Sequence, residues 1–124
     1  MFTIDSDGYL KQWDIKQQKL MKDYGQIHQG KIYSKIATND GRYLFTSDNN
    51  GELKQWDIKQ QKLLKVFGRF YSMNLIYSIT STNDSRYLFI SGDKGYLQQW
   101  DIAQQESIKD YGRIHSGAIY SMTA

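Results

Sequence analysis

The most constraining feature of this sequence is a segment that it repeats. The eleven residues LKQWDIKQQKL occur at 10–20 and again at 53–63, and a near copy, LQQWDIAQQES, runs over 97–107. The tryptophans of these segments are 43 and 44 positions apart. Flanking segments repeat in step: RYLFTSDNNG (42–51) matches RYLFISGDKG (86–95), and DYGQIHQG (23–30) matches DYGRIHSG (110–117). A fixed period of this length indicates a stack of similar structural units, each of which needs its neighbours to bury its apolar face.

The repeated unit has the composition of short β-strands. Segments such as RYLFT, ELKQWDI, KLLKVFG and LIYSIT have the usual strand length and are rich in aromatic and branched residues. Turn-forming stretches separate them, among them NDG, SDNNG and the polar KQQK. A helix over DIKQQKLLK would be too short to be stable. We therefore predict an all-β fold with four short antiparallel strands per repeat.

Composition narrows the class of protein. The 124 residues fit one small domain, and the net charge of +3 is too mild to indicate a nucleic-acid or membrane surface. The absence of cysteine excludes a disulfide framework and agrees with a reducing compartment. The sequence shows no signal peptide and no apolar run long enough to span a membrane. We expect an intracellular, cytoplasmic protein.

The repeats resemble those of the WD40 family. A Trp-Asp pair closes the third strand of each repeat, at Trp13-Asp14, Trp56-Asp57 and Trp100-Asp101. The Gly-His pair of the family is present in a stretched form, as GQIH and GRIH. The resemblance covers essentially the whole chain, 1–124. It implies WD40-type β-propeller blades, about three in number and each of four antiparallel strands, that form an open arc or part of a larger ring.

The phase of the repeat sets how such blades would be completed. With the strands of a blade named a to d, the chain reads b-c-d, then a-b-c-d twice, then a final a strand at 118–124. We expect either a piece of a longer repeat protein or a homo-oligomer in which two chains make six blades. In that oligomer the last strand of each chain completes the first blade of the other. His115 would then lie beside Asp5, Asp7 and Trp13 of the second copy.

The resemblance also implies a buried hydrogen-bonded network in each blade. Its members are a loop histidine, a hydroxyl on strand b, a turn aspartate and the strand-c tryptophan, which fits because buried imidazole and indole groups need partners. The third copy departs from this pattern, with Tyr71 in place of the histidine. The turn position of Asp7 is Asn50 and Lys94 in the other copies. The expected network residues are His28, Thr46, Ser47, Asp48 and Trp56, with Asp7, Trp13, Trp100 and His115 in the other repeats.

A catalytic interpretation of the same residues is weaker. The chain has only two histidines, 87 positions apart, and each sits in a repeated context. No serine lies in a nucleophile elbow, and no set of histidines and carboxylates has metal-ligand spacing. We expect no enzymatic activity, no cofactor and no metal.

Basic residues gather at the turns of one end of the predicted blades. They are Lys16, Lys19, Lys59 and Lys62 in the c-to-d turns, with Arg42 and Arg86 beside the a-to-b turns. Such charges are either solvated turns or a basic rim that meets an acidic partner. The expected function is a non-catalytic scaffold for protein–protein interaction. The alternative is binding of nucleic acid, phosphate or another acidic ligand through this rim.

Overall fold

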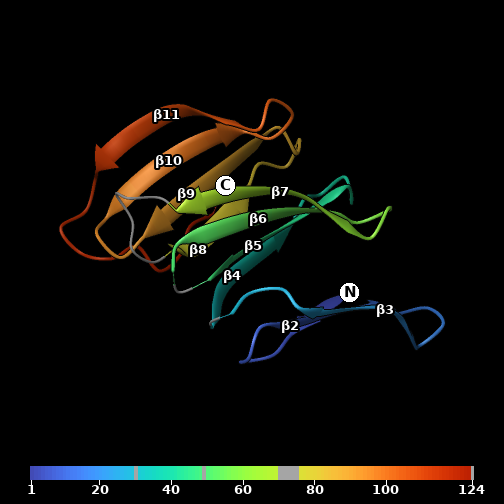
Figure 1. Cartoon of the computed structure of the whole chain (residues 1–124). Helices are drawn as coiled ribbons and strands as arrows, with labels where there is room; N and C mark the ends of the chain where they lie inside the picture. Colours follow the sequence, from blue (N-terminus) through green and yellow to red (C-terminus); the bar gives the residue numbers. More distant parts are fainter. Residues whose placement is uncertain (30, 49, 70–75, 124) are drawn as a thin grey trace. The chain divides into compact units, whose positions relative to one another are not determined.

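The computed structural model describes residues 1–29, 31–48, 50–69 and 76–123 (Figure 1). Within these ranges the chain forms eleven strands and no helix. It therefore has, within the described residues, no helix that could cross a membrane. All strand pairings in its three separate sheets are antiparallel. The predicted all-β fold is confirmed.

The first compact unit of the chain, Met1–Ile32, contains a three-stranded sheet. Its strands are β1 (Phe2–Ile4), β2 (Tyr9–Asp14) and β3 (Lys19–Gln26), in that spatial order. The Asp5 carboxylate closes the turn between β1 and β2, because its Oδ1 accepts from the backbone N–H groups of Asp7 and Tyr9 at 2.9 and 3.0 Å. This sheet contains the predicted b-c-d strands.

The second unit, Tyr33–Ala124, contains two four-stranded sheets in the described residues. In each sheet the strands lie side by side in chain order, as four antiparallel strands joined by short turns. This is the arrangement that the sequence predicts for one repeat. The second sheet consists of β4 (Ile32–Ala37), β5 (Tyr43–Asp48), β6 (Glu52–Asp57) and β7 (Lys62–Arg69), and the third of β8 (Ile76–Ser81), β9 (Tyr87–Gly92), β10 (Tyr96–Asp101) and β11 (Glu106–Arg113).

The core of this unit lies between the second and third sheets. Phe45 and Leu53 of the second sheet pack with Leu88, Ile90 and Ile102 of the third, and all five are at most 5% exposed. Alternation along each strand sends these side chains to one face. Each sheet therefore buries an apolar face that it could not bury alone.

The same irregularity recurs in all three sheets. In each, the last strand contains two register shifts against its neighbour, and one of them leaves Tyr24, Phe67 or Tyr111 as the extra residue. In the first and third sheets a glycine with positive φ follows, Gly25 at 72° and Gly112 at 70°. A bulge of this kind re-aims a side chain. In each sheet the bulge therefore sets the direction in which the aromatic ring of the last strand points.

The segment after β11 differs from the prediction of a final strand. Residues 114–123 form no strand with any described residue. The segment is held by backbone hydrogen bonds instead, from Ile114 N to Gly95 O and from Ile119 N to Gly92 O, both 2.9 Å. A strand exists only by pairing with another, and the described part of this chain supplies no neighbour here.

We predict that Gly95→Ala destabilises the fold more than Gly41→Ala. Both glycines have φ in the left-handed region, +78° and +72°, where an L side chain costs about 1–2 kcal/mol. At Gly95 the added Cβ would also lie 2.0 Å from the His115 carbonyl oxygen, whereas at Gly41 it would meet nothing within 4 Å. Urea unfolding of the two variants measures the difference. Equal losses would show that the segment after β11 does not pack on Gly95.

Candidate interaction surfaces

The tryptophans of the first two sheets are held by the same contact. The indole Nε1–H of Trp13 donates to the Thr3 hydroxyl at 2.9 Å, and that of Trp56 donates to the Thr46 hydroxyl at 3.0 Å. The threonine sits on the neighbouring strand and lies directly across from the residue two positions before the tryptophan. The structure thus brings together Trp56 and Thr46 of the expected network.

The third sheet satisfies its tryptophan differently. Ile90 occupies the place of the threonine, so no hydroxyl is available there. The Trp100 Nε1–H donates instead to Oε1 of Gln98 at 3.2 Å, and Gln98 replaces the Lys54 of the second sheet. The third sheet thus has isoleucine in place of threonine and glutamine in place of lysine. With both differences present, the indole N–H still has a hydrogen-bond acceptor.

This coupling gives a testable prediction. Thr46→Val should lower the unfolding free energy by about 1–3 kcal/mol, because it leaves the buried Trp56 N–H without this acceptor. Adding Lys54→Gln should recover part of the loss, since it installs the acceptor that the third sheet uses. Chemical denaturation of both variants and of Lys54→Gln alone measures the coupling. Additive effects of the two substitutions would contradict it.

The turn aspartate of the second sheet acts on the backbone. Asp48 is buried, and its Oδ1 accepts from the N–H groups of Asn50 and Glu52 at 2.9 and 3.1 Å. The adjacent Ser47 hydroxyl lies 3.4 Å from the Ile76 carbonyl oxygen of the third sheet. Asp48 and Ser47 therefore fix the β5–β6 turn and a point of contact between two sheets.

The remaining expected network residues lie in different settings. His28 belongs to the first unit and is buried, whereas His115 belongs to the second and is exposed. A contact of His28 with Asp48 or Trp56 spans the two units and stays a prediction. Asp7 is exposed in the β1–β2 turn, where its carbonyl oxygen accepts from Gln26 Nε2 at 2.9 Å. Tyr71 lies outside the described residues.

The glutamine directly before each tryptophan, which is Gln12, Gln55 or Gln99, accepts a side-chain hydrogen bond in every sheet. In the first and third sheets the bulged tyrosine donates its hydroxyl to this glutamine, from Tyr24 to Gln12 at 2.8 Å and from Tyr111 to Gln99 at 3.0 Å. The residue precedes the tryptophan in every copy of the repeated segment, so its fixed position was a usable signal.

In the second sheet the same glutamine faces another sheet. Phe67 has no hydroxyl, and the buried Gln55 Oε1 accepts from Nε2 of Gln105, in the β10–β11 turn, at 2.9 Å. The Phe67 ring makes an edge contact with Trp100 at a centroid distance of 5.2 Å. The contact between the second and third sheets thus combines apolar packing with a hydrogen bond between two side chains.

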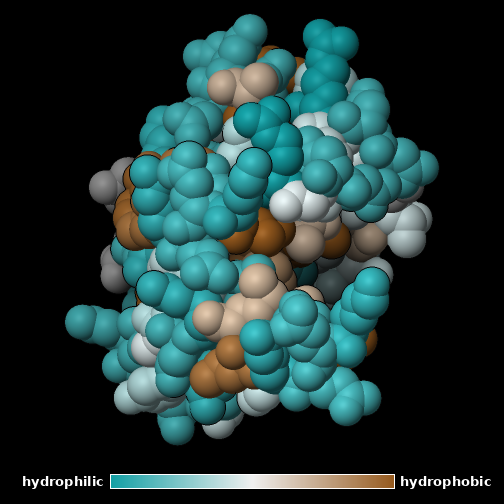
Figure 2. All heavy atoms as spheres, turned by 90° about the vertical axis from the view of Figure 1, so that its right-hand side faces the viewer, coloured by the Kyte–Doolittle hydropathy of each residue, from teal (hydrophilic) through white to brown (hydrophobic). Residues whose placement is uncertain are grey.

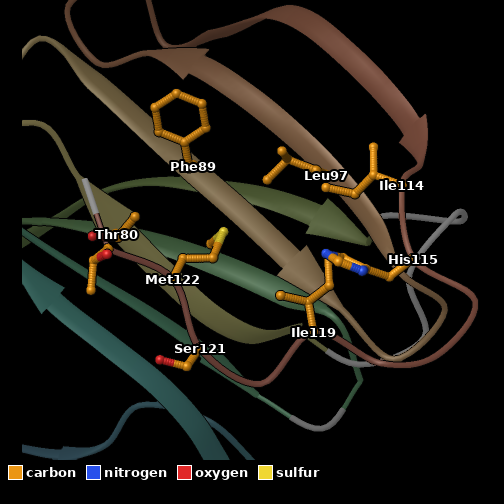
Figure 3. A pocket seen from close by; sticks show the side chains of 9 residues that line it. Thr80, Phe89, Leu97, Ile114, His115, Ile119, Ser121 and Met122 are labelled. Carbon is orange, nitrogen blue, oxygen red and sulfur yellow. The ribbon is translucent and has the colours of Figure 1, made fainter.

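The opposite face of the third sheet is only partly covered. Phe89 and Leu97 occupy the places of Phe45 and Leu53 but are half-buried rather than buried. The segment after β11 passes over them and leaves a pocket of about 390 Å³ (Figure 3). Figure 3 shows Phe89 and Leu97 on one side of this pocket and His115, Ile119 and Met122 of the segment on the other. We call the sheet face that carries Phe89 and Leu97 the outer face of the third sheet.

The a-to-b and c-to-d turns of the second unit lie at one end of each sheet. Backbone hydrogen bonds of 3.0 Å from Ile58 N to Arg42 O and from Ile102 N to Arg86 O join the two kinds of turn. The candidate basic residues there are all exposed, and Figure 2 shows a largely hydrophilic surface on this side. Arg42 and Arg86 lie over the rings of the following tyrosines at 5.2 and 5.0 Å, which keeps both guanidinium groups close to the sheet.

Each a-to-b turn is closed by an aspartate. The Thr38 hydroxyl donates to Asp40 at 2.6 Å, and this bond is the main cause that lowers the pKa of Asp40. Thr82 lowers the pKa of Asp84 in the same way, through a bond of 2.5 Å. Because the folded-state pKa values are depressed, the stabilisation is present at neutral pH and is lost as the pH falls through them.

We predict that Thr38→Val raises the pKa of Asp40 toward its ordinary value and leaves that of Asp84 unchanged. Thr82→Val should do the reverse, since the two turns have the same contacts. NMR titration of the side-chain carboxyl carbons measures both values in each variant. The stability loss of Thr38→Val should be larger at pH 7 than at a pH below the Asp40 pKa. A loss independent of pH would show that the hydroxyl does not act through the carboxylate.

Comparison with known proteins gives no assignment. No model of a known protein family matches the chain. No curated protein matches it either.

Proposed function

We propose that the chain is a non-catalytic scaffold of the WD40 propeller type that binds protein partners. The proposal draws support from the recurrence of one sheet design. The three sheets share strand order, the place of the tryptophan and the bulge in the last strand. Fold alone does not specify function, so the proposal depends on what the recurring side chains do.

The observation that carries the proposal is that the recurring polar side chains form hydrogen bonds within the protein. Trp56 and Gln55 bond to other side chains, and Asp48 bonds to the backbone of its own turn. In the other two sheets the corresponding tryptophans and glutamines also bond to side chains, and in the first sheet Asp5 bonds to the backbone of its own turn. Groups that a catalyst would need to turn toward a substrate are here engaged in holding strands and turns. The exposed turns are among the surfaces that remain free to meet a partner.

The charge of those turns suggests the chemistry of the partner. The β6–β7 turn carries Lys59 and Lys62, both exposed, with the exposed Arg42 in the adjoining β4–β5 turn. The corresponding turn of the third sheet has Ala103 and Glu106 instead of the two lysines. The positive charge is therefore local rather than spread over every repeat. An acidic peptide segment is the partner that this pattern favours.

Binding to a fluorescent glutamate-rich peptide at low salt tests the proposal. Lys59→Glu with Lys62→Glu should weaken binding by roughly threefold to tenfold, as exposed ion pairs contribute about 0.2–1 kcal/mol each. The matched control is Lys31→Glu with Lys94→Glu, which reverses two charges away from the c-to-d turns. Equal effects of the two double variants would contradict the proposal, as would no binding by the wild type.

The same assay separates the alternative function. If a single-stranded oligonucleotide binds and the peptide does not, the basic turns serve a phosphate ligand. A steep fall of that affinity with salt would support this result, because phosphate binding releases counterions.

A further inference from the structure

The β5–β6 turn of the second sheet places an asparagine directly before a glycine. Asn50 is exposed, and Gly51 follows it with φ at 74°, in the left-handed region that favours glycine. The same turn position holds Asp7 in the first sheet and Lys94 in the third, each also followed by a glycine with positive φ. The turn therefore favours glycine as the second residue of the pair, while the first residue differs between the three sheets.

An asparagine before a glycine can lose ammonia without an enzyme. The backbone nitrogen of Gly51 attacks Cγ of Asn50, and the new N–Cγ bond closes a five-membered succinimide ring. The bond from Cγ to Nδ2 breaks, and the amide group leaves as ammonia together with the proton of the Gly51 N–H. Water then opens the ring. Opening at Cγ gives aspartate, and opening at the main-chain carbonyl carbon gives isoaspartate, in which the main chain runs through Cγ.

The structure leaves the side chain of Asn50 unrestrained. Its backbone N–H donates to Asp48 Oδ1 at 2.9 Å, but its side-chain amide has no hydrogen-bond partner among the described residues. The amide of Asn39 instead donates to Asn83 Oδ1 at 3.2 Å. Both of these asparagines precede an aspartate, whose side chain hinders attack by its own backbone nitrogen. Because Gly51 has no side chain, only Asn50 of these three has both a free amide and an unhindered nucleophile.

One hydrogen bond of the turn opposes the reaction. The Gly51 N–H donates to the Asp48 carbonyl oxygen at 3.2 Å, which is at the long end of the range for such bonds. This bond has to open before the nitrogen can reach the Asn50 side chain. The rate of ammonia loss therefore depends on how often this turn opens while the rest of the sheet stays folded.

The first sheet indicates that the turn accepts the aspartate product. Asp5 Oδ1 accepts there from the N–H groups of Asp7 and Tyr9, at 2.9 and 3.0 Å. Asp48 Oδ1 makes the same two bonds in the second sheet, at 2.9 and 3.1 Å. Asp7 is thus already an aspartate at the position where Asn50 would become one.

The isoaspartate product does not fit the same turn. It adds one carbon atom to the main chain between positions 50 and 51, inside the segment that Asp48 closes onto the N–H of Glu52. Asp48 is buried and cannot follow the longer chain outward, so its bonds are lost or stretched. The adjacent Ser47 hydroxyl lies 3.4 Å from the Ile76 carbonyl oxygen, so a displaced turn also disturbs a contact between two sheets.

We infer that Asn50 is a site of spontaneous deamidation in the folded chain. Its isoaspartate product loosens the β5–β6 turn, whereas its aspartate product leaves the turn intact. The only co-reactant is water, and either product lowers the net charge of +3 by one unit. The inference does not depend on what the basic turns bind.

Incubation of the folded 124-residue chain in heavy-oxygen water at mildly alkaline pH gives the first test. Digestion and mass spectrometry locate each asparagine that has exchanged its amide for a labelled carboxylate, and the label excludes deamidation during digestion. Asn50 should react at least about tenfold faster than Asn83, a difference of ~1.4 kcal/mol in activation free energy. Asn50→Gln is the control, because glutamine has to close a larger ring and should stay unlabelled. No label at Asn50, or equal rates at Asn50 and Asn83, overturns the inference.

Unfolding in urea gives the second test. Chromatography separates the two products from the unreacted chain, and an isoaspartyl methyltransferase identifies the isoaspartate form. That form should unfold at a lower urea concentration than the unreacted chain. Asn50→Asp is the matched control, since it has the same charge with a normal main chain, and it should unfold together with the wild type. Equal midpoints for the isoaspartate form and Asn50→Asp would contradict the inference.

Discussion

The structure depends on the contact of one sheet face with the next. A four-stranded sheet of this length has two faces and too little material to cover either by itself. Between the second and third sheets the contact is made by Phe45 and Leu53 against Leu88, Ile90 and Ile102. The turns, bulges and tryptophan contacts all serve to present these side chains in register. In repeat proteins, stability is mainly the sum of such neighbour contacts, so the sheets at either end of a series are the weakest.

Much of the fold follows from the sequence because its determinants are local. Turn residues such as Gly41 and Asp48 and the alternation along RYLFT define strands without reference to distant parts. Confirmation of the all-β fold, with four antiparallel strands in each complete repeat, reflects this locality. The period of the repeat adds the order of the strands, since equal sequences adopt equal structures.

The features that could not be predicted from the sequence depend on contacts between strands and between sheets. The exchange of Thr46 for Ile90 with a new acceptor at Gln98 could be found only once the strands were paired. The role of Gln55 depends on a bulge and on a turn of another sheet. The final segment was predicted as a strand from its similarity to β4, but a strand also needs a partner, and similarity does not supply one.

The exchange of tyrosine for phenylalanine at Phe67 has a consequence for how the chain sorts its parts during folding. Near-identical repeats compete for one another's places, and misassembled neighbours are a characteristic failure of such proteins. Tyr24 and Tyr111 each satisfy the glutamine of their own sheet, whereas Phe67 leaves Gln55 to bond with Gln105. The absence of one hydroxyl group, at Phe67, therefore distinguishes the second sheet from the first and third. Because Gln55 is left to bond with Gln105, the second sheet favours the neighbour that carries this glutamine over the other copies.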